Sequence, residues 1–180
     1  NKEKLNLFPK VVGHDENFLI INYLENNKKK PNKIDSQFIN ILTQLHSKSS
    51  EKFGFYFDTQ IGGMRQSNDF DQNWAVFFAE KRLNVIFETI CKTNPMPKKI
   101  NHNLENLIRS LNEKIPSNPK PSLLHGDLWE GNILFNNGKF VGLIDPGSYY
   151  GHNEMEIAYL RWFNLIDEDF IKKYSEIISI

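Results

Sequence analysis

The sequence has little cysteine, no excess of either charge and no long apolar run. A single cysteine, Cys91, cannot form an intramolecular disulfide, so nothing points to an oxidising compartment. Lys and Arg number 22, as do Asp and Glu, which removes the main argument for a nucleic-acid or anionic-membrane partner. No apolar run approaches the roughly 18 residues of a membrane span, and the polar start, broken by Pro9, is unlike a signal peptide. We therefore expect a cytoplasmic protein that binds neither nucleic acid nor a membrane.

The composition that remains suits a folded domain. With 180 residues, 39% of them hydrophobic and 13% aromatic, the chain can fill the core of one domain or of one large lobe. The first residue is Asn rather than Met, and the last, Ile180, falls inside a helical pattern. We expect the chain to be incomplete at both ends.

Apolar spacing predicts strands first and helices next. Strands are expected near Lys10–Val12 and at Phe18–Ile21, and the second is apolar at every position, which indicates burial on both faces. Three amphipathic helices follow from the 3.6-residue period, at about residues 34–46, 71–91 and 100–115. The second has an apolar stripe made of Trp74, Phe77, Phe78, Val85 and Ile86. The stretch 53–73, rich in Gly, Asn and Asp, is expected to be a loop.

A hairpin and further helix complete the pattern. Asn137-Gly138 is a strong hairpin turn signal between the apolar runs Ile133–Phe135 and Phe140–Ile144, and helical spacing returns after Gly151. The order predicts an α+β fold that is mostly helical.

Three oxygen-bearing side chains lie around this hairpin: Asp127, Asn132 and Asp145. With the turn at Asn137-Gly138, Asn132 lies across from about Leu143, so Asp145 is about 7 Å further along at the usual strand rise. Asp127 precedes Asn132 by five residues on a glycine-flanked loop. Such hard oxygen ligands suit Mg²⁺ that shares its shell with substrate phosphates.

The spacing His125-Gly126-Asp127-x₄-Asn132 matches the catalytic loop of kinases, with Gly in place of Arg. In that interpretation Asn132 and Asp145 hold Mg²⁺ against the nucleotide phosphates, and Asp127 accepts the proton of the attacking hydroxyl. His125 is expected to support the loop by hydrogen bonding. Taken singly, the three could instead be a turn residue, a hairpin residue and a strand end before Pro146.

These segments resemble the fructosamine kinase (ketosamine-3-kinase) family of the protein-kinase-like superfamily. The likeness is carried by residues 124–132 (LHGDLWEGN) and 144–152 (IDPGSYYGH), and it extends from about Pro9 to Phe163. The resemblance implies a protein-kinase-like fold in which residues 1–24 are the last strands of the nucleotide lobe with the hinge, and residues 25–180 are the helical C-terminal lobe.

The resemblance also assigns residues. Asp127 would be the base on the 3-hydroxyl of a ketosamine, with ATP and Mg²⁺ as cofactors. The hinge segment Ile21, Asn22, Tyr23 and Leu24 would bond adenine through its backbone. The substrate side would be formed by Trp129, Gln66, Asn68 and His125. The implied partner is a small or protein-bound glycated amine, and the implied role is deglycation.

The chain departs from the family at two positions of one motif and in its length. Asn153 and Glu156 stand where the family usually has Arg and Asp, and that Asp steadies the catalytic loop in kinase-like folds. The phosphate-covering loop and its lysine should precede residue 1, so these 180 residues alone are expected to catalyse little. The alternatives are a small-molecule kinase of the aminoglycoside or choline type, and a silenced kinase-like nucleotide-binding protein.

Overall fold

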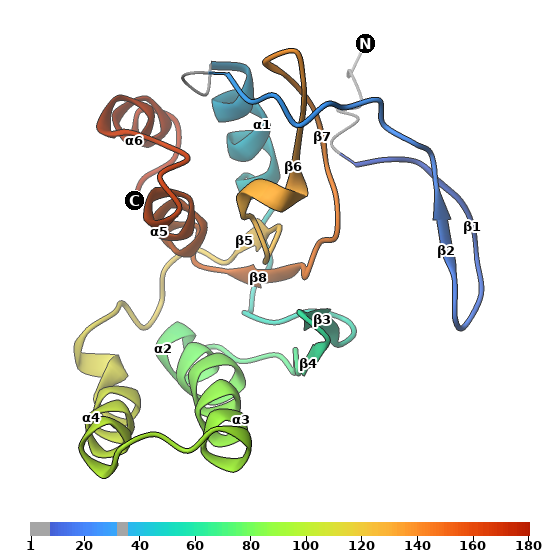
Figure 1. Ribbon diagram of the computed structural model, residues 1–180. Helices are drawn as coiled ribbons and strands as arrows, with labels where there is room; N and C mark the ends of the chain where they lie inside the picture. Colours follow the sequence, from blue (N-terminus) through green and yellow to red (C-terminus); the bar gives the residue numbers. More distant parts are fainter. Residues whose placement is uncertain (1–7, 32–35) are drawn as a thin grey trace. The chain divides into compact units, whose positions relative to one another are not determined.

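The computed structural model describes residues 8–31 and 36–180, which form two compact units (Figure 1). The first unit comprises the chain up to Lys48 with His125–Pro146 and Asn153–Ile180; the second comprises Ser49–Leu124 and Gly147–His152. The expected mixture of helices and strands is confirmed. No helix in the described ranges is long and apolar enough to span a bilayer.

The first unit is built from helices around a hairpin. Its elements are β1 (Val11–His14), β2 (Leu19–Ile21), α1 (Ser36–His46), β6 (Ile133–Asn136), β7 (Lys139–Leu143), α5 (Glu154–Trp162) and α6 (Glu168–Ser175). Phe38 and Leu42 on α1, Leu143 on β7 and Leu160 on α5 are all at most 1% exposed and belong to one core cluster, which Tyr174 of α6 joins. Fully burying side chains of this size stabilises a fold by about 1.5–3 kcal/mol each. The apolar face of the amphipathic helix predicted at about residues 34–46 is therefore the packed face of α1. Ile34, the first residue of that prediction, lies outside the described residues.

The expectation that Phe18–Ile21 is buried on both faces is wrong. Phe18, Leu19 and Ile20 are 70%, 65% and 59% exposed. Within the described residues, β2 pairs only with β1, and a two-stranded hairpin covers neither of its own faces. Both strands themselves are confirmed, shifted by one or two residues.

The β6–β7 hairpin is confirmed, but its register differs by one residue from the simple prediction. A bulge between Leu134 and Phe135 brings Ile133, rather than Asn132, opposite Leu143. Asn132 instead accepts a hydrogen bond of 3.1 Å from the Ile144 amide. A bulge adds one residue to one strand, so Asn132 lies one position nearer to Asp145 than an unbroken ladder would place it.

The second unit combines helices with two small sheets. Its elements are β3 (Thr59–Ile61), β4 (Met64–Gln66), α2 (Trp74–Phe78), a π-helical segment (Ala79–Asn84), α3 (Val85–Thr93), α4 (Lys98–Arg109), β5 (Ser122–Leu124) and β8 (Tyr149–Gly151). β3 pairs with β4 across Gly62-Gly63, where a loop was expected, and β5 pairs with β8. Two glycines between short strands are themselves a hairpin signal, so the loop prediction overlooked it.

The apolar stripe of the second predicted helix is only half buried. Trp74 and Phe77 are 3% and 0% exposed, whereas Val85 and Ile86 are 36% and 42% exposed. The π-helical segment between them adds residues to the turn, which rotates the later residues off the buried face. Arg82 takes the buried position instead, with its guanidinium 4.1 Å from the centre of the Tyr149 ring.

Candidate active site

The segment from His125 to Asn132 forms a loop that ends at β6. His125 is fully buried; its Nε2 atom lies 3.0 Å from the Ile144 carbonyl, and its Nδ1 atom accepts the Asp127 amide at 3.3 Å. Burial lowers the pKa of His125, against the raising effect of Glu156 and the Ile144 carbonyl. A neutral imidazole that donates from Nε2 and accepts at Nδ1 fits both contacts, so the ring joins the loop to the end of the hairpin as expected.

Gly126 and Glu156 set the backbone of this loop. Gly126 has φ 87°, a left-handed conformation in which the arginine of the usual kinase motif would be strained. Glu156 accepts the Gly126 amide at 2.7 Å and the His125 amide at 3.1 Å, and its other contact is His46 Nε2 at 2.8 Å. The Glu156 side chain, one methylene longer than the Asp usual in the family, thus reaches the loop from α5.

Glu156 is ionised in this setting. Burial by itself would raise the pKa of Glu156, but the bonds from His46 and the Gly126 amide and the nearby His125 lower it below its usual value overall. An anionic carboxylate holding two backbone amides is a strong clamp on the loop.

Asp127 is half-buried and lies beside Asn132. Asn132 Nδ2 donates to the Asp127 carbonyl at 2.8 Å and to its Oδ2 atom at 3.1 Å. Burial raises the pKa of Asp127, with Asp145 and Glu156 adding to the shift, while His125 and Asn132 oppose it. A carboxylate with a raised pKa accepts a proton more readily, which suits a general base.

Asn132 and Asp145 lie at the open end of the β6–β7 hairpin, one just before β6 and the other just after β7. Because Asn132 Nδ2 is used on Asp127, its Oδ1 atom is the one left for a ligand. Asp145 is exposed, and its φ of 52° is a left-handed backbone conformation just after the end of β7. An amide oxygen and a carboxylate fit Mg²⁺, which is usually held by one or two protein carboxylates together with substrate phosphates and water. Within residues 8–31 and 36–180, no cluster of three or more His, Cys, Asp or Glu could hold a metal.

Trp129 and the predicted hinge also lie in the first unit. Trp129 is 41% exposed, and a Cβ added at Gly131 would come within 2.4 Å of its indole, so the ring covers that glycine. Ile21 ends β2, and the Asn22 amide donates to the Lys10 carbonyl at 2.9 Å. Tyr23 is 81% exposed. Adenine binding by Ile21–Leu24 stays a prediction.

Gln66 and Asn68 belong to the second unit. Asn68 is 1% exposed; its Nδ2 atom donates to the Phe57 carbonyl and the Thr59 hydroxyl, and its Oδ1 atom accepts from Arg82 at 2.6 Å. These bonds give it a clear structural role. Gln66 is 7% exposed, and its buried Nε2 atom has no hydrogen-bond partner in the described part of the chain.

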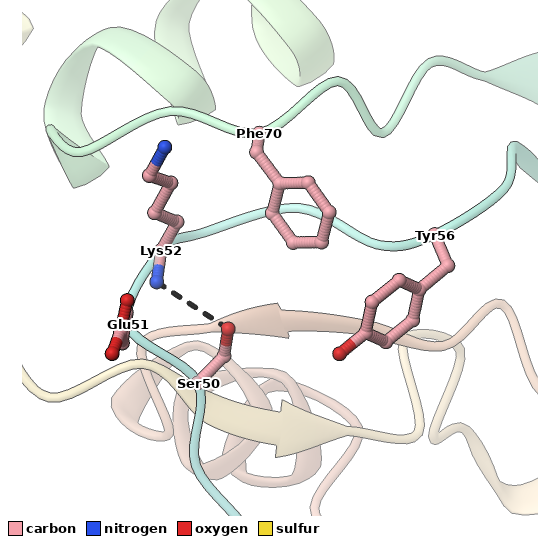
Figure 2. A pocket seen from close by; sticks show the side chains of 5 residues that line it. All are labelled: Ser50, Glu51, Lys52, Tyr56 and Phe70. Atoms are coloured by element: carbon pink, nitrogen blue, oxygen red, sulfur yellow. Dashed lines mark hydrogen bonds between the residues drawn. The ribbon is translucent and has the colours of Figure 1, made fainter.

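An open pocket of about 340 Å³ also lies in the second unit, and Figure 2 shows the side chains that line it. They are Ser50, Glu51, Lys52, Tyr56 and Phe70. The Tyr56 and Phe70 rings meet edge to face with 5.5 Å between their centres. None of the residues predicted from the sequence lines this pocket.

Three residues near the loop of residues 125–132 were missed in the sequence analysis. The Tyr159 hydroxyl lies at Asp127, and the pKa of Tyr159 is raised by burial and then by the charge and hydrogen bond of that carboxylate. His46 and Tyr174 lie behind Glu156. A polar residue on the apolar face of a helix was the only available signal for His46.

Comparison with known proteins settles the family. The profile of the fructosamine kinase family matches residues 8–180. The chain belongs to the fructosamine kinase family. Kinases of this family are protein-kinase-like, and the resemblance noted from the sequence is confirmed.

The relatives of the chain include bacterial and plant proteins. A probable ketoamine kinase of Vibrio cholerae is 32% identical over 164 residues, which cover 89% of this chain and 54% of the relative. The chloroplastic protein-ribulosamine 3-kinase of Arabidopsis thaliana is 32% identical over 142 residues, covering 76% and 42%. The crystal structure of a candidate fructosamine-3-kinase from Thermobifida fusca superposes with a TM-score of 0.84 at 26% identity, covering 96% and 59%. The chain therefore spans about half the length of the curated relatives it matches.

Proposed function

We propose that the protein carrying this chain is a kinase that transfers the γ-phosphoryl group of ATP to the 3-hydroxyl of a ketosamine, with Mg²⁺. The observation that carries the proposal is the arrangement around Asp127: a half-buried carboxylate that accepts a hydrogen bond from Asn132 and whose pKa is raised by burial and by the charge of Asp145. The names of the relatives specify the acceptor, since they are ketoamine and ribulosamine kinases. A phosphorylated ketosamine that releases its amine would make the role deglycation.

In this mechanism Asp127 takes the proton of the acceptor hydroxyl as it attacks the phosphorus. Asn132 Oδ1 and the Asp145 carboxylate would hold Mg²⁺, whose positive charge would offset the negative charge of the phosphates. Positioning and charge neutralisation supply most of the acceleration in phosphoryl transfer. Glu156 contributes by holding the His125 and Gly126 amides, which fixes the backbone that carries Asp127.

The substrate side is proposed to include Trp129 and Gln66. Gln66 supports this role through its buried and unbonded Nε2 atom, because a donor left without a partner costs about 1–3 kcal/mol unless something accepts from it. A sugar hydroxyl is a suitable acceptor. Asn68, whose side-chain atoms all have protein partners, is proposed to support this region.

We also propose the lobe division of the sequence analysis, with residues 1–24 in the nucleotide lobe and the hinge, and residues 25–180 in the helical lobe. The exposed apolar face of β2 supports this division, because it suits a strand that other strands would cover. Cytoplasmic location and the low activity of these 180 residues alone stay predictions.

The test is ATP turnover by the complete gene product with fructosyl-lysine, ribulosyl-lysine and an aminoglycoside, followed by ³¹P NMR. We expect phosphate on the 3-position of a ketosamine, and a loss of about 10²–10⁴-fold in kcat for Asp127→Asn. The control is Asp169→Asn, which removes an exposed helix pair with Lys173. Phosphorylation of the aminoglycoside alone would favour the other small-molecule kinases, and no product with any acceptor would favour a silenced kinase.

A further inference from the structure

A buried chain of polar side chains runs behind the catalytic loop. His46, Asn153, Glu156 and Tyr174 are all at most 4% exposed and come from α1, from the residue before α5, from α5 and from α6. The Tyr174 hydroxyl lies 2.7 Å from His46 Nδ1 and 2.9 Å from Asn153 Nδ2. His46 Nε2 lies 2.8 Å from Glu156, which holds the loop amides.

The orientation of the Asn153 amide is set by the carbonyl of Ser179. Asn153 Nδ2 also lies 3.2 Å from the Ser179 carbonyl, which can only accept. The nitrogen therefore faces both Ser179 and Tyr174, and the Tyr174 oxygen must accept one of its hydrogens.

The hydrogen bond from Asn153 to Tyr174 fixes where the Tyr174 hydroxyl hydrogen and the His46 ring hydrogen lie. Burial raises the pKa of Tyr174 to about 12, so its hydroxyl keeps its proton. The only acceptor that the described contacts offer to this proton is His46 Nδ1. A proton on Nδ1 would leave the buried Tyr174 hydroxyl without an acceptor, a state that proteins avoid. With Nδ1 accepting, the ring proton of a neutral His46 is on Nε2 and points at the Glu156 carboxylate.

We propose that Asn153 and Tyr174 are positioning residues that hold His46 neutral with its proton on Nε2, and through it fix the Glu156 carboxylate under the catalytic loop. The hydrogen bonds run in one direction, from Asn153 to Tyr174 to His46 to Glu156. This links α6 and Ser179 to the backbone beside Asp127. The kinetic consequence rests on the proposed kinase function, whereas the protonation state of His46 does not.

The first measurement is ¹⁵N NMR of the histidine rings in the complete gene product. We expect Nδ1 of His46 to resonate as an unprotonated nitrogen and Nε2 as a protonated one near neutral pH. A proton on Nδ1, alone or together with one on Nε2, would overturn the proposal.

Asn153→Asp tests the direction of these hydrogen bonds, because aspartate has nearly the same size and shape as asparagine. An aspartate carboxylate accepts where the amide donated, so the Tyr174 hydroxyl turns toward residue 153 and can accept from His46. We expect His46 Nδ1 to gain a proton in this variant. An unchanged His46 spectrum in a folded variant would contradict the proposed direction.

Tyr174→Phe tests the effect on activity, because it removes the hydroxyl and keeps the buried ring. We expect kcat to fall by about 10–100-fold, as for small displacements of catalytic groups, with an unchanged KM for ATP. Tyr56→Phe, on an exposed ring of the second unit, is the matched control.

The two readouts separate the two hypotheses. If no acceptor is phosphorylated, the proposed function fails and the NMR experiments still decide the hydrogen-bond direction. If the wild type is active and Tyr174→Phe has normal kcat, the positioning role fails while the function stands. Should Tyr174→Phe not fold, Asn153→Asp and its kcat take its place: a moved proton with unchanged kcat would refute positioning.

Discussion

Replacing Glu156 by Gln removes the negative charge that accepts the His125 and Gly126 amides and leaves the volume of the side chain almost unchanged. In the wild type, one carboxylate oxygen accepts the Gly126 amide at 2.7 Å, and the other accepts the His125 amide at 3.1 Å and contacts His46 Nε2 at 2.8 Å. Glutamine has one oxygen and one NH₂ group, so it can satisfy only one side. The more favourable orientation of the glutamine amide places its oxygen at the His125 amide and His46 Nε2. Its NH₂ group then faces the Gly126 amide, which loses its acceptor.

The magnitude follows from these contacts. Losing a hydrogen bond to a charged group costs about 1.5–3 kcal/mol, and leaving the buried Gly126 amide without an acceptor costs about 1–3 kcal/mol more. We therefore expect Glu156→Gln to lower the free energy of unfolding by about 3 kcal/mol, a large part of the 5–15 kcal/mol typical of a protein. The loss is uneven, because it falls on Gly126 more than on His125.

Amide hydrogen exchange measured by NMR resolves these two residues. A loss of about 1.5–3 kcal/mol at one bond speeds exchange by about 10–150-fold, so the Gly126 amide should exchange that much faster while the His125 amide changes less. Glu176→Gln is the control, since it makes the same exchange at an exposed position just after α6 and should leave both amides unchanged. Equal protection of Gly126 in wild type and Glu156→Gln, or a larger change at His125, would refute the reasoning.

Further predictions concern pH, the metal and the backbone. The pKa of Glu156 is lowered in the folded protein, so the ionised carboxylate stabilises the fold above its unfolded pKa of about 4.5, and this stabilisation is lost as the pH falls below that value. Urea unfolding at several pH values should show this loss of stability at low pH in the wild type, and a smaller loss in Glu156→Gln. Asp145→Ala should weaken Mg²⁺-dependent ATP binding by at least about ten-fold in calorimetry, and equal affinity at matched Mg²⁺ would exclude Asp145 as a ligand. Gly54→Ala should destabilise the protein by about 2 kcal/mol or more, because the added Cβ would lie 2.6 Å from the Asn68 carbonyl and φ is +118°; a Tm within about 2 °C of wild type would contradict this.

Much of the catalytic loop could be predicted because its chemistry is local. The spacing of Asp127, Asn132 and His125 and the hairpin turn at Asn137-Gly138 lie within a short stretch, where backbone geometry limits how far apart the side chains can be. The structure brings Asn132 onto Asp127 at 3.1 Å, as this spacing indicates. The role of Glu156 was open at the sequence level, since an extra methylene could have displaced the loop. The structure shows it reaching both amides.

Other predictions were wrong because they depend on tertiary neighbours and local helix geometry that a sequence pattern does not specify. The apolar strand Leu19–Ile21 was expected to be buried, yet burial requires elements on both faces, and β1 alone supplies neither. The exposure of Val85 and Ile86 follows from the π-helical segment, which breaks the 3.6-residue period used to place them.

The sequence by itself determined the family, the first helix, the β6–β7 hairpin and the identity of the residues from His125 to Asn132, since each is written in short motifs and local periodicity. Only the tertiary structure decided what supports them. His46 meets Glu156 across 110 positions and Tyr174 across 128, contacts that exist because α1, α5 and α6 pack around one core. Spacing along the chain says little about such pairs. The packing of the helices also buries their polar groups, and burial decides which hydrogens they share and how strongly they hold the loop.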